Sequence, residues 1–162
     1  MKMKHIFSFL LAALLALPMA AQDGKSFYEK YSDADGVEAV HVSGFMLHLV
    51  DRLMPAEDED DLKLKQFMKT FSGVYVLSSE NARVSANIMK DVEKAVKRSN
   101  CEELLEAKED GEVTHIYTMG DEDTVRSLFI VTQDDDEVTL VSIDGKIPRE
   151  ELEKAIAESQ KD

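Results

Sequence analysis

The stretch EVTHIYTMGDEDTVRSLFIVTQDDDEVTLVSIDGKI, residues 112–147, decides the fold of this chain. It contains three β-prone runs, rich in valine, isoleucine and threonine, at residues 113–119, 125–132 and 137–143. Polar clusters at residues 120–123 and 134–136 predict the turns between them. The last two runs are apolar on both faces in places, as expected for central strands of a covered sheet. Ile130 and Leu140 are therefore predicted core residues.

Three more strands are predicted outside this stretch, at residues 37–43, 73–79 and 101–108. The segment 101–108 lies between a long helix and the turn at residues 109–111, which favours an edge strand paired with residues 113–119. Two predicted helices separate the strands at 37–43 and 73–79. That separation allows a parallel pair joined by a right-handed crossover.

Five helices are predicted, at residues 26–31, 45–54, 61–71, 81–98 and 148–159. Their apolar residues recur at helical spacing, and those of the helices at 26–31, 61–71, 81–98 and 148–159 are expected to face the core. In the second and third helices the apolar residues at this spacing are Met46, Leu49, Val50 and Leu53, and Leu64, Phe67, Met68 and Phe71. The pair Asp144 and Gly145 is predicted to turn the chain into the last helix.

These elements predict a single α+β domain of two layers. Its sheet is expected to be mostly antiparallel with about six strands, and the helices are expected to pack mainly on one face. The chain has 162 residues, enough for one domain with a substantial core. The predicted organisation is a signal peptide at residues 1–21, followed by this domain at residues 22–162.

The first residues have the composition of an export signal. Lys2 and Lys4 precede an almost unbroken apolar run at residues 6–17, which is shorter than the roughly 20 residues needed to span a bilayer. Cleavage is expected between Ala21 and Gln22, giving a soluble periplasmic or secreted protein. No cysteine lies near this junction, so the sequence predicts no lipid anchor on a cysteine.

The chain is acidic, with a formal net charge of -14 at pH 7. This charge disfavours nucleic acid and anionic membrane surfaces as partners, and no membrane insertion is expected after signal cleavage. Cys101 is the only cysteine, so the chain closes no internal disulfide and packing must stabilise the fold. A single thiol can act as a nucleophile or pair two chains, but an isolated cysteine after a helix is more often a small, partly buried apolar residue.

Catalytic chemistry would have to come from His41, His48, His115, Cys101 and the acids. His41 and His115 lie on predicted strands, where a carboxylate could join them in a metal site, but their spacing is uninformative. The sequence shows neither a nucleophile-elbow motif nor a glycine-rich phosphate loop. We therefore assign no catalytic, cofactor-binding or metal-binding residue and expect no cofactor. A hydrolase or metal-dependent enzyme with a site built from scattered residues stays an alternative.

Two acidic runs, residues 57–61 and 134–136, raise a further alternative. They would give low-affinity binding of cations or basic peptides. The simpler interpretation is that they are solvated loops that promote solubility. The acids at residues 57–61 also precede a predicted helix and suit the positive end of its dipole.

Four segments together resemble a known family: FYEKYSDADGVEAVHVSGFMLHLV, VYVLSSE, EELLEAKEDGEVTHIYT and LFIVTQDDDEVTLVSIDGKI. They are similar to domain of unknown function family 4252 (DUF4252), small exported proteins of Gram-negative bacteria. The resemblance covers nearly all of the chain after residue 21 and implies a single exported α+β domain. It implies no activity and no site residues. It does imply a link to envelope stress sensing, because relatives tend to be encoded near regulators of that response.

The function we expect is that of a non-enzymatic binding or interaction module in the bacterial envelope. A small domain with a largely antiparallel sheet, no disulfide and no site motif suits docking through a sheet face or an edge strand. The expected partner is another envelope protein.

Overall fold

The computed structural model describes residues 23–98 and 100–159. The predicted signal peptide, residues 1–21, lies outside this range, as does its cleavage site. Among the described residues, no helix is both long enough and apolar enough to cross a membrane.

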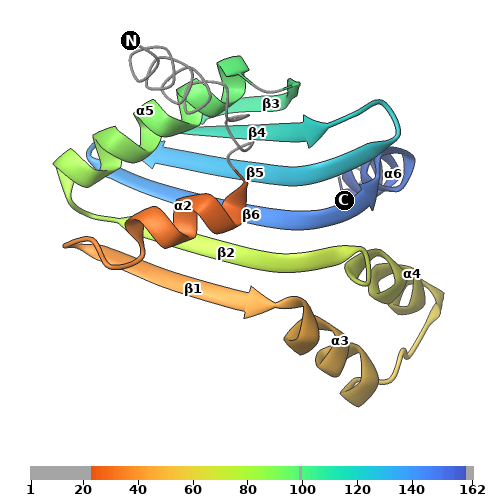
Figure 1. Cartoon of the computed structure of the whole chain (residues 1–162). Coiled ribbons are helices and arrows are strands. Elements are labelled where there is room, and N and C mark those ends of the chain that lie inside the picture. The colour runs from red at the N-terminus through yellow and green to blue at the C-terminus, as the bar shows by residue number, and fades with distance from the viewer. Residues whose placement is uncertain (1–22, 99, 160–162) are drawn as a thin grey trace, which may run out of the picture.

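In this part of the chain, an antiparallel six-stranded sheet carries the helices (Figure 1). The strands are β1 (Val37–Ser43), β2 (Phe71–Ser79), β3 (Cys101–Glu109), β4 (Glu112–Gly120), β5 (Thr124–Asp134) and β6 (Glu137–Pro148). The helices are α2 (Gly24–Tyr31), α3 (Gly44–Leu53), α4 (Glu59–Met68), α5 (Ala82–Arg98) and α6 (Arg149–Ser159). The strand order is β1-β2-β6-β5-β4-β3. The predicted α+β fold with a mostly antiparallel sheet is confirmed.

The quoted stretch forms the meander β4-β5-β6, and β3 pairs with β4 at one edge, as predicted. The possible parallel arrangement of β1 and β2 is wrong, because these strands are antiparallel neighbours. The two helices between them do not cross the sheet. They fold back at one end of it, so the chain re-enters beside the strand it has left (Figure 1).

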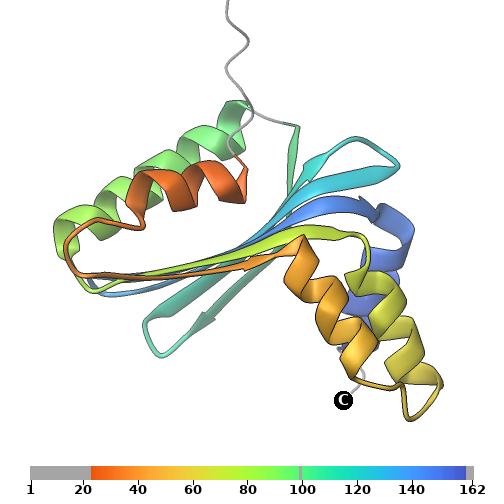
Figure 2. The ribbon, with the colours of Figure 1, turned by 60° about the horizontal axis from the view of Figure 1, so that its bottom comes forward.

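The main core lies between the sheet and the pair α2 and α5, which cover one face (Figure 2). Ile88, Val92 and Ala95 of α5 are buried, as their spacing predicts. Phe27 of α2 packs edge-on against Phe129 of β5, with ring centroids 5.4 Å apart. The sheet adds Leu77, Phe129, Val131, Val138 and Leu140 to this core.

The second face carries a smaller cluster at one end of the sheet, where α6 packs. Its buried members are Val125, Leu128, Ile147 and Leu152. Because successive residues of a strand point to opposite faces, Ile130 lies on this second face while Val131 lies in the main core. Ile130 is only half-buried, whereas Leu140 is 1% exposed. The core prediction is thus confirmed for Leu140 and wrong for Ile130.

Leu140→Ala should lower the free energy of unfolding by about 2–5 kcal/mol, because it removes buried contacts and leaves a cavity. Ile130→Ala should cost clearly less, since its side chain already meets solvent. Urea denaturation of both variants measures the difference through the midpoint. Equal losses would show that the second face is as well packed as the first.

A buried carboxylate on β6 holds the first helix in place. Asp144 accepts hydrogen bonds from the backbone N–H groups of Gly24 and Lys25, at 3.0 and 3.1 Å, and from the hydroxyl of Ser127 at 2.8 Å. Two of the unpaired N–H groups at the start of α2 are thereby satisfied. The approach is close enough that a Cβ at Gly24 would lie 2.0 Å from the Oγ of Ser142.

The predicted turn at Asp144 and Gly145 is therefore wrong, since β6 continues through both residues to Pro148. An aspartate before a glycine usually indicates a turn in which its carboxylate is solvated or bonds its own backbone. Here that carboxylate is buried and bonds a distant helix. Gly145 is needed for a close approach of β2, because a Cβ there would lie 2.3 Å from the carbonyl oxygen of Thr70.

Asp144→Asn should destabilise the fold by about 1–3 kcal/mol, because an amide cannot accept from both backbone N–H groups and the buried donors lose a partner. The loss should appear in the urea midpoint and in faster amide exchange of α2. Asp135→Asn, at the exposed β5–β6 turn, is the matched control and should change the midpoint little. If the two variants were equally mild, Asp144 would not anchor α2.

Candidate functional site

A helical hairpin, α3 and α4, connects β1 to β2. A two-residue turn can join antiparallel neighbours of this kind, so the connection does not need the helices. Polar contacts hold them together: Lys65 Nζ donates to the carbonyl oxygen of Asp51 at 2.9 Å, and Lys69 Nζ lies 3.4 Å from the Asp51 carboxylate. Ser43 and Asp58 cap their N-termini. The hairpin is an ordered addition to the sheet.

The apolar stripe of α3 faces solvent. Met46, Val50 and Leu53 recur at i, i+4 and i+7 on one side of the helix, and their exposed fractions are 46%, 38% and 72%. The buried residue of α3 is Leu47, and Leu49 is half-buried. The helix and the predicted spacing are confirmed, but this side of the helix faces solvent rather than the sheet. Periodicity shows which residues share a side of a helix, but not which side meets the sheet.

Helix α4 also exposes apolar residues to solvent, and none of its residues is fully buried. Leu62 and Leu64 are exposed, so the predicted core stripe is wrong at Leu64. Phe67 does turn inward and packs edge-on against Phe71, which belongs to β2, and both join the cluster on the second face. We call the exposed apolar residues of the two helices the hairpin surface: Phe45, Met46, Val50, Leu53, Met54, Leu62 and Leu64.

An apolar row also crosses the second face of the sheet. The strand registers place in one line Val40, Val76, Val141, Ile130, Ile116 and Leu105. Its ends are exposed, at 54% for Val40 and 38% for Leu105, and the residues between them are half-buried. Figure 2 shows α3, α4 and α6 on this side of the sheet, gathered toward one end. The row therefore extends away from the hairpin over a face that the helices cover only in part.

The first acidic run lies beside the hairpin surface and shapes α4. Asp58 accepts from the backbone N–H of Asp61 at 2.8 Å, and Asp61 accepts from that of Glu57 at 3.1 Å. Glu59, Asp60 and Asp61 belong to the first turn of the helix, where they suit its dipole. In the second acidic run, Asp134 is the last residue of β5, and Asp135 and Asp136 form the exposed β5–β6 turn. Binding of cations or basic peptides by these runs stays a prediction.

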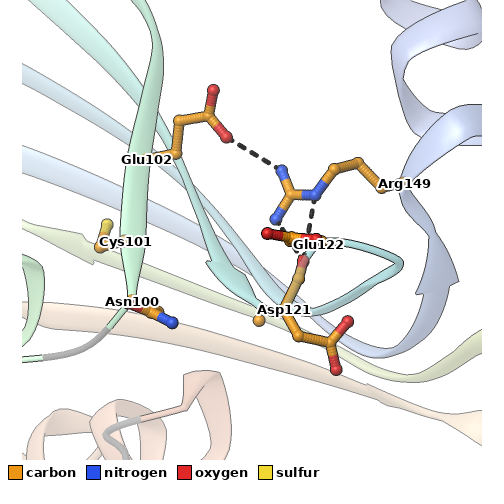
Figure 3. Close-up of a pocket in the computed structure, with 7 residues that line it drawn as sticks. Asn100, Cys101, Glu102, Asp121, Glu122 and Arg149 are labelled. Atoms are coloured by element: carbon orange, nitrogen blue, oxygen red, sulfur yellow. Dashed lines mark hydrogen bonds and ion pairs between the residues drawn. The ribbon is translucent and has the colours of Figure 1, made fainter.

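A pocket of about 350 Å³ lies where the ends of β3 and β4 meet the start of α6 (Figure 3). Arg149 points into the pocket, and its guanidinium group is held by hydrogen bonds to other residues of the protein. Its guanidinium donates to the Glu102 carboxylate at 3.1 Å and to the carbonyl oxygen of Asp121 at 3.0 and 3.2 Å. These bonds tie α6 to two strand ends, which is a structural role for the arginine.

Cys101 lines the same pocket but is a poor nucleophile. Burial and the nearby charge of Glu103 raise the pKa of its thiol to about 11. At neutral pH the thiol is therefore protonated, and the thiolate is the form that reacts. This geometry supports the interpretation of Cys101 as a partly buried apolar residue.

Alkylation of Cys101 by iodoacetamide at pH 8 should be slow, because a pKa near 11 leaves about one hundredth of the thiolate of an ordinary cysteine. The rate should rise as the pH approaches 11. The same protein unfolded in urea is the control and should react at the ordinary rate. Rapid labelling of the folded chain at pH 8 would contradict the assignment and reopen the nucleophile alternative.

The histidines considered in the sequence do not come together. His41 lies on β1 and stacks on Tyr75, with ring centroids 4.5 Å apart. His48 is exposed on α3. His115 lies on β4, far along the strand order, where two carboxylates of β3 approach it: Glu103 at 3.2 Å and Glu106 at 3.8 Å. Sequence reasoning missed this pair of glutamates, because their convergence depends on an irregularity in β3 that the residue pattern does not reveal.

The fold and these surfaces define a small α+β domain with exposed apolar surface on one side of its sheet. Residues 28–155 match the family described as Domain of unknown function (DUF4252), and the chain belongs to this family. The crystal structure of PA94, a protein of unknown function from Pseudomonas aeruginosa, is similar at 9% identity over 77% of each chain, with a TM-score of 0.34. A comparison with curated proteins finds no significant match.

Proposed function

We propose that this protein is exported to the bacterial envelope and binds another protein there through the hairpin surface and the adjoining apolar row. One observation carries the proposal: α3, a helix that the sheet does not require, turns its apolar stripe toward solvent. Single exposed leucines are ordinary, but three apolar residues that share one side of a helix and all face solvent are typical of an interaction site. The exposed methionines among these residues suit an adaptable binding surface.

The acidic charge of this chain limits which kinds of partner can bind the hairpin surface. The acids at residues 57–61 border the hairpin surface, and the whole chain carries a net charge of -14. A second copy would bring a strongly acidic chain against itself, and an anionic membrane surface would be repelled in the same way. We infer a partner segment with apolar side chains flanked by lysine or arginine.

The cellular location is part of the proposal. A basic start followed by an apolar run, within residues 1–21, supports export and cleavage of a signal peptide. The product would be soluble in the periplasm or secreted, without a lipid anchor on a cysteine. The family resemblance supports a link to envelope stress sensing. The partner would then be a regulator of that response.

A photo-cross-linking residue at Leu53 tests this proposal in the producing cell. Leu53 is 72% exposed, so the replacement should leave the fold intact. We expect one discrete adduct with a different envelope protein. A separate variant, Leu53→Asp, should no longer co-purify with that protein, because it places a charge in the apolar contact.

The matched control carries the same cross-linker at Glu93, on the solvent side of α5, which should give no adduct. Equal labelling from Glu93 would mean that the contact is non-specific. An adduct of twice the mass of this chain would identify a second copy as the partner and contradict the inferred chemistry. If the cross-linker at position 53 formed no adduct, the proposed interaction function would be contradicted.

A further inference from the structure

A bulge in strand β3 changes which of its side chains share a face. The register skips one residue between Glu103 and Leu105. In a regular strand, residues three apart point to opposite faces, and an extra residue reverses that relation. Glu103 and Glu106 consequently lie on one face. On that face Glu103 is paired with Tyr117 of β4, and Glu106 is paired with His115.

Three potential ligand atoms converge as a result. His115 Nδ1 lies 3.2 Å from Oε2 of Glu103 and 3.8 Å from Oε2 of Glu106, and all three atoms lie within 4.8 Å of one another. Donors bound to a tetrahedral Zn²⁺ at about 2.1 Å are separated by about 3.4 Å, which falls between these two distances. The side chain of His115 is 20% exposed and those of the glutamates are 44% and 40% exposed, so an ion can enter from solvent and keep water ligands.

The neighbouring tyrosine supports this arrangement. The ring of Tyr117 stacks on that of His115, with centroids 5.5 Å apart and planes 11° apart. Tyr117 is also hydrogen-bonded to the side chain of Glu103, so it contacts two of the three proposed ligands. Groups that orient ligand side chains in this way are a usual part of metal sites.

We propose that Glu103, Glu106 and His115 bind a divalent transition-metal ion of the Zn²⁺ type and thereby clamp the edge strand β3 to β4. The imidazole nitrogen favours Zn²⁺, Ni²⁺ or Cu²⁺ over Ca²⁺ and Mg²⁺, which prefer sites made of oxygen ligands. The site lies on the opposite face of the sheet from the apolar row. It is therefore independent of the proposed docking function.

Lys108 gives the proposal a distinctive signature. Its Nζ lies 2.7 Å from Oε1 of Glu106, so the ammonium group competes for one oxygen while the other faces His115. A bound cation would be repelled by this neighbour. Removing Lys108 should therefore tighten metal binding, whereas removing a ligand should weaken it.

Isothermal titration of the purified protein with Zn²⁺ tests the site. We expect saturable binding of one ion per chain, accompanied by a shift of the His115 ring signals in NMR. His115→Ala and Glu106→Gln should each weaken binding by at least about tenfold, as even losses of supporting groups do in known sites. Lys108→Met should tighten it.

His41→Ala is the matched control and should leave the affinity unchanged, because that ring stacks on Tyr75 away from the cluster. Urea midpoints of all variants in the absence of metal establish that each one is folded. Zinc binding that survives His115→Ala and falls when Asp134, Asp135 and Asp136 are neutralised would place the ion on the acidic turn and overturn the proposal. Absence of saturable binding would leave the cluster as an ordinary ion pair.

Discussion

Side chains alternate between the two faces of a β-strand, and this constraint divides the molecule into a covered side and a partly open side. Every residue that β5 and β6 send into the main core has neighbours that point the other way. Helices α2 and α5 cover the first face, where Phe129, Val131 and Leu140 are buried. On the second face, α6 covers one end and the apolar row extends beyond it. The two faces therefore differ: packing on the first stabilises the fold, and the second leaves part of its apolar surface exposed.

The sequence predicted a helix or strand correctly where neighbouring residues alone determine the backbone conformation. The runs at residues 113–119, 125–132 and 137–143 became β4, β5 and β6, because β-branched and aromatic residues between turn clusters leave few other conformations. Helix α5 was equally clear from the spacing of Ile88, Val92 and Ala95. The apolar stripe on α3 was recognised from its spacing, but the spacing did not give its direction, because tertiary packing decides which face of a helix is buried.

The proposed interaction surface and the proposed metal site depend on spatial relations that a single sequence does not contain. His115 was noted as a candidate metal ligand, but Glu103 and Glu106 are three residues apart and would point to opposite faces of a regular strand. Only the bulge in β3 brings them together. Asp144 likewise had the local signature of a turn, and its real role follows from bonds to a helix far away in the chain. Such residues are misjudged because their partners are distant in sequence.

The anchoring of α2 has a consequence for the order in which the chain folds. The hydrogen bond from Gly24 to Asp144 closes a loop of 120 residues, and β2 finds its second partner only in β6. Contacts between distant segments form late, since the entropy of closing the loop must be overcome before they contribute. Helix α2 thus cannot form these bonds until the C-terminal strand β6 has been made. If the chain is exported as we propose, this dependence would keep α2 from docking before translocation and so leave the chain in a form that can still be threaded across a membrane.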